Sequence, residues 1–161
     1  MENPLLELQE YENLQEALKK AKGPVQATGT LDSQKVHLMY WLGKDGGFPW
    51  KLVVTYDDQR AREIYDDFRS FTENVWLYPA KDLLFYSADI HGNLMTRQRI
   101  AVWRHLMEEK EGVVVTTLDG LMDHLLPLVF LKQQAVTVEN GQIMDLDEWK
   151  ERLTALGYER T

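Results

Sequence analysis

The sequence has no cysteine, fewer basic than acidic residues and no long apolar run. Without cysteine, disulfides and thiolate metal sites are excluded. The 18 lysines and arginines are outnumbered by 26 aspartates and glutamates, which gives a net charge of −8. Domains that hold nucleic acid by its phosphates depend on lysine and arginine. This balance therefore argues against a free-standing nucleic-acid-binding domain.

The chain also lacks a candidate membrane-spanning or secretory segment. No apolar stretch approaches the length that crosses a bilayer, and the opening residues, MENP, do not begin a signal peptide. Together with the absence of cysteine, this favours a cytoplasmic protein without membrane contact. At 161 residues, 44% of them hydrophobic, the chain is long enough for one domain with a substantial core and too short for two large ones.

Patterns typical of catalysis and metal binding are missing as well. The histidines have no ligand spacing such as H-x-x-x-H, so we expect packed or surface side chains at His37, His91, His105 and His124. Three carboxylate pairs are expected to cap helices or to lie on solvated helix faces: Asp57-Asp58, Asp66-Asp67 and Glu108-Glu109. Only the first pair follows a strand, where a magnesium site is conceivable. No G-x-S-x-G nucleophile motif is present, and the sequence predicts no catalytic residue, cofactor or metal.

The spacing of apolar residues predicts the order of helices and strands. Apolar residues at helical spacing predict a helix over 5–21, ended by Gly23-Pro24. Short β-branched runs predict strands at 25–27, 51–56, 75–78, 113–117 and 135–138, and the continuously apolar run at 51–56 is typical of a strand buried on both faces. Further helices are expected from Asp32 or Ser33 to Leu42, from Asp57 or Asp58 to Phe71, over 94–111 with Ile100 and Trp103 on the apolar face, over 118–126, and from Asp145 or Asp147 to Leu156.

Strands and helices that alternate in this way predict an α/β fold, a parallel sheet with helices on both faces. Ligands of such sheets bind beyond the carboxyl ends of the strands. The loops at 28–33, 55–58, 78–82 and 116–119 are therefore the candidate surface.

The segment Val25–Leu42 holds the most informative of these loops. A short strand, a loop at Thr28-Gly29-Thr30 and a helix give it the layout of a phosphate-binding loop, G-x-x-x-x-G-K-[ST]. Gln26 and Leu31 stand at the positions of the template's two glycines, and Asp32 stands at the position of its lysine. Only Ser33 keeps the residue type of the template. The leucine obstructs close approach of the backbone to a phosphate, and the aspartate places a negative charge where a positive one is required. We expect a structural loop without nucleotide, in which Asp32 serves as a helix cap.

A second candidate site lies on the helix expected over 94–111. Arg97, Arg99 and Arg104 form the chain's basic-aromatic cluster together with Trp103. The pattern favours a helix with a charged outer face and the tryptophan in the core; a protein or DNA contact is the alternative. The five tryptophans and seven tyrosines exceed what a small core hides easily, so Trp41, Trp50 and Trp149 are candidates for an interface.

Several segments carry a resemblance through their order and spacing: the TGT loop, KLVVTYDDQRAREIYDDFRSF, VWLYPAKDLLFY, MTRQRIAVWRHL, GVVVTTLDGLM and VENGQIMDLDEWKERLTALGYER. Together they resemble the N-terminal region of the bacterial transcription-repair coupling factor, which is itself similar to the start of the nucleotide-excision-repair protein UvrB. The resemblance covers nearly the whole chain from Val25 onward.

The resemblance implies a helicase-like (RecA-like) fold with a degenerate nucleotide site. In the family this region recruits UvrA, whereas separate later domains bind RNA polymerase and use ATP to move along DNA. It implies a first domain over 1–138 and, over 139–161, the opening strand and helix of a second small domain. The family's main UvrA-contacting surface follows the GYER motif and is therefore expected to lie outside this sequence.

Two functions from different classes remain. The first is a non-catalytic protein-interaction module that links stalled transcription to nucleotide excision repair. The alternative is a nucleotide-dependent helicase or ATPase domain. The broken phosphate loop argues against the alternative, as does the lack of a D-E-x-x magnesium motif after the strand expected at 113–117.

Overall fold

The structure is a computed structural model, and it describes residues 2–80, 89–122, 129, 140–141 and 145–155. The chain divides into two units, Met1–His124 and Leu125–Thr161. The predicted boundary between 138 and 139, the predicted strand at 135–138 and the expected end of the last helix at Leu156 lie outside the described residues. No helix in the described part is both long and apolar enough to cross a membrane.

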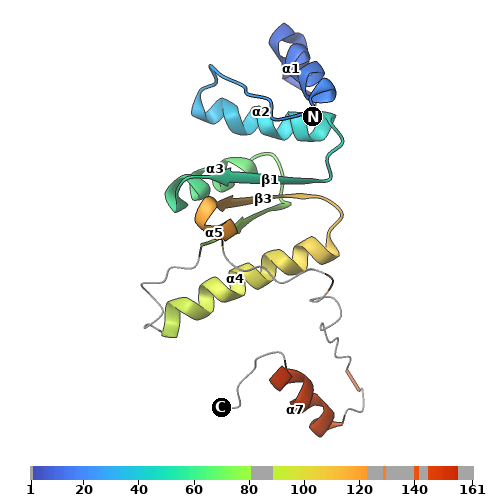
Figure 1. The fold of residues 1–161 in the computed structure, drawn as a ribbon, viewed down its shortest axis with the longest axis vertical. Coiled ribbons are helices and arrows are strands. Elements are labelled where there is room, and N and C mark those ends of the chain that lie inside the picture. Colours follow the sequence, from blue (N-terminus) through green and yellow to red (C-terminus); the bar gives the residue numbers. More distant parts are fainter. Residues whose placement is uncertain (1, 81–88, 123–128, 130–139, 142–144, 156–161) are drawn as a thin grey trace. The chain divides into compact units, whose positions relative to one another are not determined.

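The first unit is built on a three-stranded parallel sheet (Figure 1). Its strands are β1 (Trp50–Thr55), β2 (Val75–Tyr78) and β3 (Gly112–Thr117), in the order β1-β3-β2. Trp50 pairs with Gly112 at the start of β1, and Val75 pairs with Val113 at the start of β2. All six residues of β3 are buried, because this strand has a neighbour on each edge and packed helices on both faces. The predicted parallel α/β sheet is thus confirmed for these three strands.

The first strand corrects one expectation. The run KLVVTY predicted a strand buried on both faces, but Leu52 is 58% exposed and Val54 43% exposed. Val53, which points the opposite way, packs against the core. An apolar run shows that a strand can be buried, whereas burial itself requires a covering element on each face.

Seven helical segments are described. They are η1 (Pro4–Glu7), α1 (Gln9–Lys20), α2 (Asp32–Asp45), α3 (Asp58–Arg69), α4 (Asp89–Glu108), α5 (Leu118–Met122) and α7 (Leu146–Ala155). Asp57 caps α3 by accepting a hydrogen bond from the Arg60 backbone N–H at 2.6 Å, as predicted. Asp145 accepts a hydrogen bond from the Asp147 N–H at 2.9 Å at the start of α7, which settles the choice between these two caps.

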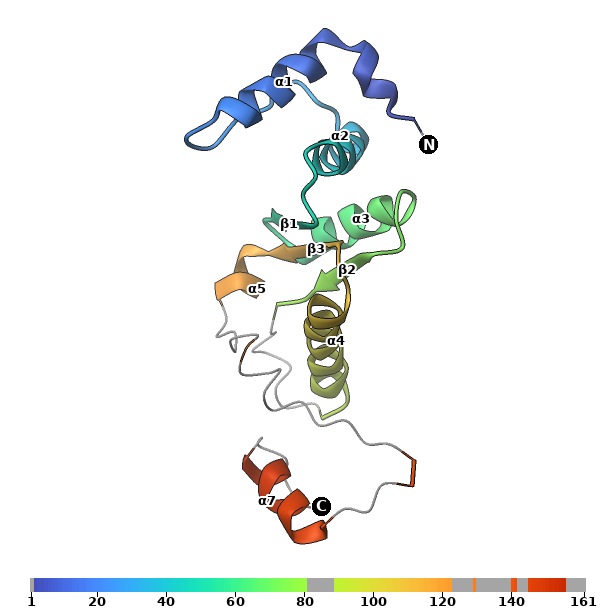
Figure 2. The same cartoon turned by 90° about the vertical axis from the view of Figure 1, so that its right-hand side faces the viewer.

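The core lies on both faces of the sheet. On one face Phe68 and Ile64 of α3 and Val36 of α2 pack against Val113 and Val115. On the other face α4 packs through Val102, Trp103 and Leu106, and Figures 1 and 2 show α3 and α4 on opposite sides of the strands. Ile100 was expected on the buried face of α4 but is exposed. Val102 takes the buried place, because the face of α4 that packs on the sheet is formed by Val102, Trp103 and Leu106.

Trp41 is 2% exposed and therefore offers almost no surface to an interface. Its side chain is buried, and its Nε1–H donates to Nε2 of His37 at 2.9 Å. The imidazole of His37 stacks on Phe71 with 5.4 Å between ring centroids. His37 is therefore a packed histidine, as the sequence predicted. Trp50 and Trp149 are half-buried, so an interface role for them stays a prediction.

The N-terminal segment is joined to the end of α2 by one carboxylate. Oδ2 of Asp45 accepts hydrogen bonds from Nδ2 of Asn3 at 2.6 Å, from the Tyr11 hydroxyl at 2.8 Å and from Nε2 of Gln15 at 3.2 Å. Burial, and next the hydrogen bond to Asp45, raise the pKa of Tyr11 from 10.0 to about 12. The neutral phenol is the form that holds α1 on α2.

This contact predicts a loss of stability at high pH. Because the folded pKa lies above the unfolded one, the contribution of Tyr11 is complete below pH 10.0 and is lost as the pH rises through about 12. Absorbance titrations of the unmodified chain and of Tyr11→Phe are compared, and the difference between them is the tyrosinate signal of Tyr11. We expect this difference to develop near pH 12. A difference that develops near pH 10 would contradict the arrangement.

Candidate functional site

The start of α2 lies where the sequence places a degenerate phosphate loop, but the strand of that motif is absent. The backbone of 24–28 has no regular structure, so the strand predicted at 25–27 is wrong. A run of three residues is short for a strand, and among the described residues β1 pairs only with β3. The arrangement is loop and helix, without the strand that fixes a working phosphate loop.

The loop turns at Gly29 and then enters the helix. Gly29 has φ +84, a backbone conformation that L side chains rarely adopt, so this glycine is required by the turn. It occupies neither of the two glycine positions of the phosphate-loop template. Thr30 is half-buried, whereas Gln26, Thr28 and Ser33 are exposed. The loop therefore keeps a glycine for its own turn and none for wrapping a phosphate.

The helix cap differs from the one that the sequence predicted. Leu31 is the N-cap residue, and Asp32 is the first residue of the helix. The leucine side chain has no acceptor, so half of a capping box remains, in which Oε1 of Gln34 accepts from the Leu31 N–H at 3.1 Å. The carboxylate of Asp32 is thus free of the capping role and stands at the positive end of the helix dipole.

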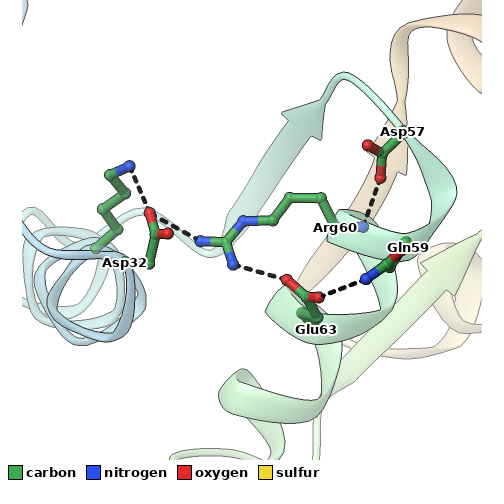
Figure 3. A network of polar contacts seen from close by, with 6 residues as sticks. Asp32, Asp57, Gln59, Arg60 and Glu63 are labelled. Carbon is green, nitrogen blue, oxygen red and sulfur yellow. Dashed lines mark hydrogen bonds and ion pairs between the residues drawn. The ribbon is translucent and has the colours of Figure 1, made fainter.

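Asp32 is held by two cations, as Figure 3 shows. Its Oδ1 lies 2.8 Å from Nζ of Lys35, one turn along α2, and 3.2 Å from Nη2 of Arg60 in α3. Arg60 also donates from Nη1 to Oε2 of Glu63 at 2.8 Å, and Glu63 accepts from Gln59 at 3.2 Å. The four charged side chains form one network that connects the start of α2 to the first turns of α3.

The exposure of these groups places the arginine at the centre of the network. The side chain of Arg60 is 17% exposed, whereas that of Asp32 is 68% exposed. The hydrogen bond from Lys35, and next the charge of Arg60, lower the pKa of Asp32. The hydrogen bond from Arg60 likewise lowers the pKa of Glu63, and Glu63 raises the pKa of Arg60. The cations near this helix terminus are therefore already neutralised by carboxylates of the chain itself.

A titration tests this network. Because the folded pKa of Asp32 is depressed, its ion pairs contribute stability above the unfolded pKa of about 3.9 and lose it as the pH falls through the lower folded pKa. We expect the carboxyl resonance of Asp32 to titrate below its ordinary range, and to move back towards it in Lys35→Met. The exposed Lys22→Met is the control and should leave the titration unchanged. An ordinary pKa in the unmodified chain would contradict the network.

The loop also borders a pocket of about 410 Å³. Thr28 and Thr30 line it from the loop, Gln34 and His37 from α2, and Tyr11 from α1. Its remaining lining is largely apolar and includes Leu5, Leu8, Leu14, Ala27 and Leu38. Asp32, Lys35 and Arg60 are not among the lining residues. The charged network and the pocket are thus separate features of the same loop.

The arginine cluster of α4 is not one surface. Arg99 is 7% exposed, and its Nη1 donates to the carbonyl oxygen of Pro79 at 3.3 Å. Its guanidinium carbon lies 4.5 Å from the centroid of the Tyr78 ring, and Trp103 meets the same ring edge-on at 6.2 Å. The prediction of a charged outer face is therefore wrong for Arg99, because the end of β2 offers an aromatic ring and a carbonyl that attract the guanidinium.

The other two arginines of the cluster are exposed. Arg104 lies 3.8 Å from the carboxylate of Glu108 one turn on, and Arg97 is exposed near the middle of α4. The structure therefore separates an internal arginine from two solvated ones.

The network residues Arg60 and Lys35 were not singled out from the sequence. The i,i+3 pairs Asp32–Lys35 and Arg60–Glu63 were a readable signal, whereas the link between them depends on how α2 and α3 pack.

Comparison with known proteins gives one consistent relationship. No family model matches the sequence. Over 111 residues, 68% of the chain, it is 24% identical to the transcription-repair-coupling factor of Staphylococcus haemolyticus strain JCSC1435, and the same values hold for Staphylococcus aureus strain USA300 and Staphylococcus epidermidis strain ATCC 35984. This chain is distantly similar to part of a transcription-repair-coupling factor. The matched region is 10% of each of those relatives, so the chain spans only a small part of their length.

Proposed function

We propose that this chain is a non-catalytic protein-interaction module of a transcription-repair coupling factor. The module corresponds to the UvrB-like N-terminal region, with a helicase-like fold and a nucleotide site that has lost its function. The distant similarity to staphylococcal coupling factors supports the proposal, as does the parallel sheet with helices on both faces. Its partner is UvrA, and RNA polymerase and DNA are engaged through other domains of the parent protein.

The observation that carries the non-catalytic part is the pairing of Asp32 with Lys35 and Arg60. A phosphate at a helix N-terminus is held by backbone N–H groups and by side-chain cations. Here a carboxylate stands in the first turn and already holds both nearby cations. A nucleotide phosphate would meet the negative charge of Asp32 and would have to compete with it for those cations. This charge arrangement is unfavourable for an ATPase.

The test of the partner is a pull-down with immobilised UvrA. Two proteins are compared: this chain, and this chain joined to the residues that follow the matched region in the Staphylococcus aureus coupling factor, with UvrA from the same species. We expect the longer protein to be retained and this chain to be retained weakly or not at all. Retention of neither would contradict the assignment to UvrA recruitment. As a specificity control, UvrB-coated resin should retain neither protein.

A further inference from the structure

A second pocket lies at the amino ends of the strands, whereas α/β proteins usually bind ligands beyond the carboxyl ends. It has a volume of about 350 Å³ and is bordered by the end of α2, the turn that follows it and the first residues of β1 and β3. Two lysines line it, Lys44 from α2 and Lys51 from β1. The volume falls within the range of pockets for small ligands.

The side chain of Lys51 packs against a glycine of α2. Gly43 is buried within α2, where glycine is less favourable than alanine by about 1 kcal/mol. A Cβ at this position would lie 2.6 Å from Cε of Lys51, 3.1 Å from Cγ and 3.2 Å from Cδ. The methylene stem of Lys51 therefore packs against α2 at Gly43, and a larger residue at position 43 would displace this flexible side chain. The contact brings Lys51 to the end of α2, where Lys44 lines the same pocket.

Lys44 is also held by packing. Its Nζ lies 4.9 Å from the centroid of the Trp41 ring and 5.8 Å from that of Tyr40. Such cation–π contacts orient an ammonium group without neutralising its charge. In the described part of the chain, neither Lys44 nor Lys51 has a carboxylate oxygen within ion-pair distance. A protein with a net charge of −8 thus places around one cavity two lysines that form no ion pair with the residues that the structure describes.

We propose that this pocket binds a small polyvalent oxyanion, one that carries phosphate or carboxylate groups. Lys44 and Lys51 supply the positive charge, and Thr72 and Asn74, which also line the pocket, have side chains that can donate hydrogen bonds. Glu111 also lines the pocket, and its negative charge opposes an anion. Because Glu111 and Lys44 are both exposed, water and salt weaken the effect of each charge. The site is separate from the Asp32 network and does not depend on the function proposed above.

Titration of the whole chain tests the site, with pyrophosphate and citrate as the two probes. Backbone amide resonances of Gly43, Gly47 and Gly112 are the readout, because all three glycines line the pocket. Both probes should shift these resonances at constant ionic strength, with affinities that weaken as salt is added. Response to pyrophosphate alone identifies phosphate groups as the ligand, and response to citrate alone identifies carboxylates. No shift with either probe overturns the proposal.

Variants that keep the stem and remove the charge separate binding from folding. Lys51→Met and Lys44→Met should each weaken binding by about tenfold, the expected effect of losing one hydrogen bond to a charged group. Lys22→Met, which is exposed and does not line the pocket, is the matched control and should bind as the unmodified chain does. Glu111→Gln should tighten binding by a few-fold. Equal affinity of Lys51→Met and Lys22→Met, with both variants folded by their amide spectra, would overturn the site.

Discussion

Replacing Phe68 by alanine should lower the free energy of unfolding by about 3–5 kcal/mol, the range for removing a large aromatic side chain from a well-packed core. Phe68 is 1% exposed and belongs to the cluster in which α2 and α3 meet the sheet. Its ring packs with Val36, Ile64 and Val115, so truncation leaves a cavity that touches three elements. Urea denaturation followed by tryptophan fluorescence measures the loss, because Trp41 is buried beside this core.

The matched control is Phe48→Ala. Phe48 is the same residue type but is 55% exposed, in the turn that follows α2. Its replacement should cost less than about 1 kcal/mol, as for most substitutions away from the core. Equal losses in the two variants would mean that the core is not centred on α3. The placement of the Asp32–Arg60 network would then also be in doubt, because the same packing of α2 against α3 creates it.

Arg99→Met should lower the free energy of unfolding by about 2–3 kcal/mol. The substitution keeps a long apolar stem and removes the guanidinium group, which donates to the Pro79 carbonyl and lies over the Tyr78 ring. A hydrogen bond to a charged group contributes about 1.5–3 kcal/mol, and a desolvated cation–π contact up to about 2 kcal/mol. The hydrogen bond and the cation–π contact involve the same guanidinium group, so the expected loss of stability is smaller than the sum of the two contributions. Thermal and urea unfolding both measure the effect.

The other two arginines of α4 provide the comparison. Arg97→Met and Arg104→Met should each change stability by less than about 0.5 kcal/mol, because both side chains are exposed and the Arg104–Glu108 pair is solvated. A larger loss in either of them than in Arg99→Met would contradict the described orientation of α4. If α4 serves as an interaction surface, Arg97 and Arg104 are available on it and Arg99 is not.

Local signals in the sequence predicted much of the fold. The β-branched run at the centre of the sheet became β3, and Asp57, one of the two predicted caps, capped α3. Each of these depends on residues within one turn or one strand. The exposure of Leu52 and Val54 could not be read from KLVVTY, because burial depends on what covers the strand. The strand expected at 25–27 failed for a related reason, since a strand of three residues exists only if a neighbour pairs with it.

The candidate site was predicted in outline and not in its contacts. By spacing alone, the sequence places Asp32 where the template of a phosphate loop has its lysine. It did not show that Arg60, from another helix, holds that aspartate, because the pair depends on how α2 packs against α3. Arg99 is a similar case. Its place in the basic cluster suggested a solvated face, but the end of β2 provides an internal partner for its charge.

Calorimetric titration of the chain with ATP and Mg²⁺ tests the central claim most directly, namely that the start of α2 is no longer a nucleotide site. Because Asp32 holds Lys35 and Arg60, we expect no binding stronger than about 1 mM, which corresponds to roughly 4 kcal/mol of binding free energy. UvrB titrated under the same conditions provides the positive control. Micromolar binding to the unmodified chain, weakened by Arg60→Met, would contradict the account and favour the nucleotide-dependent alternative.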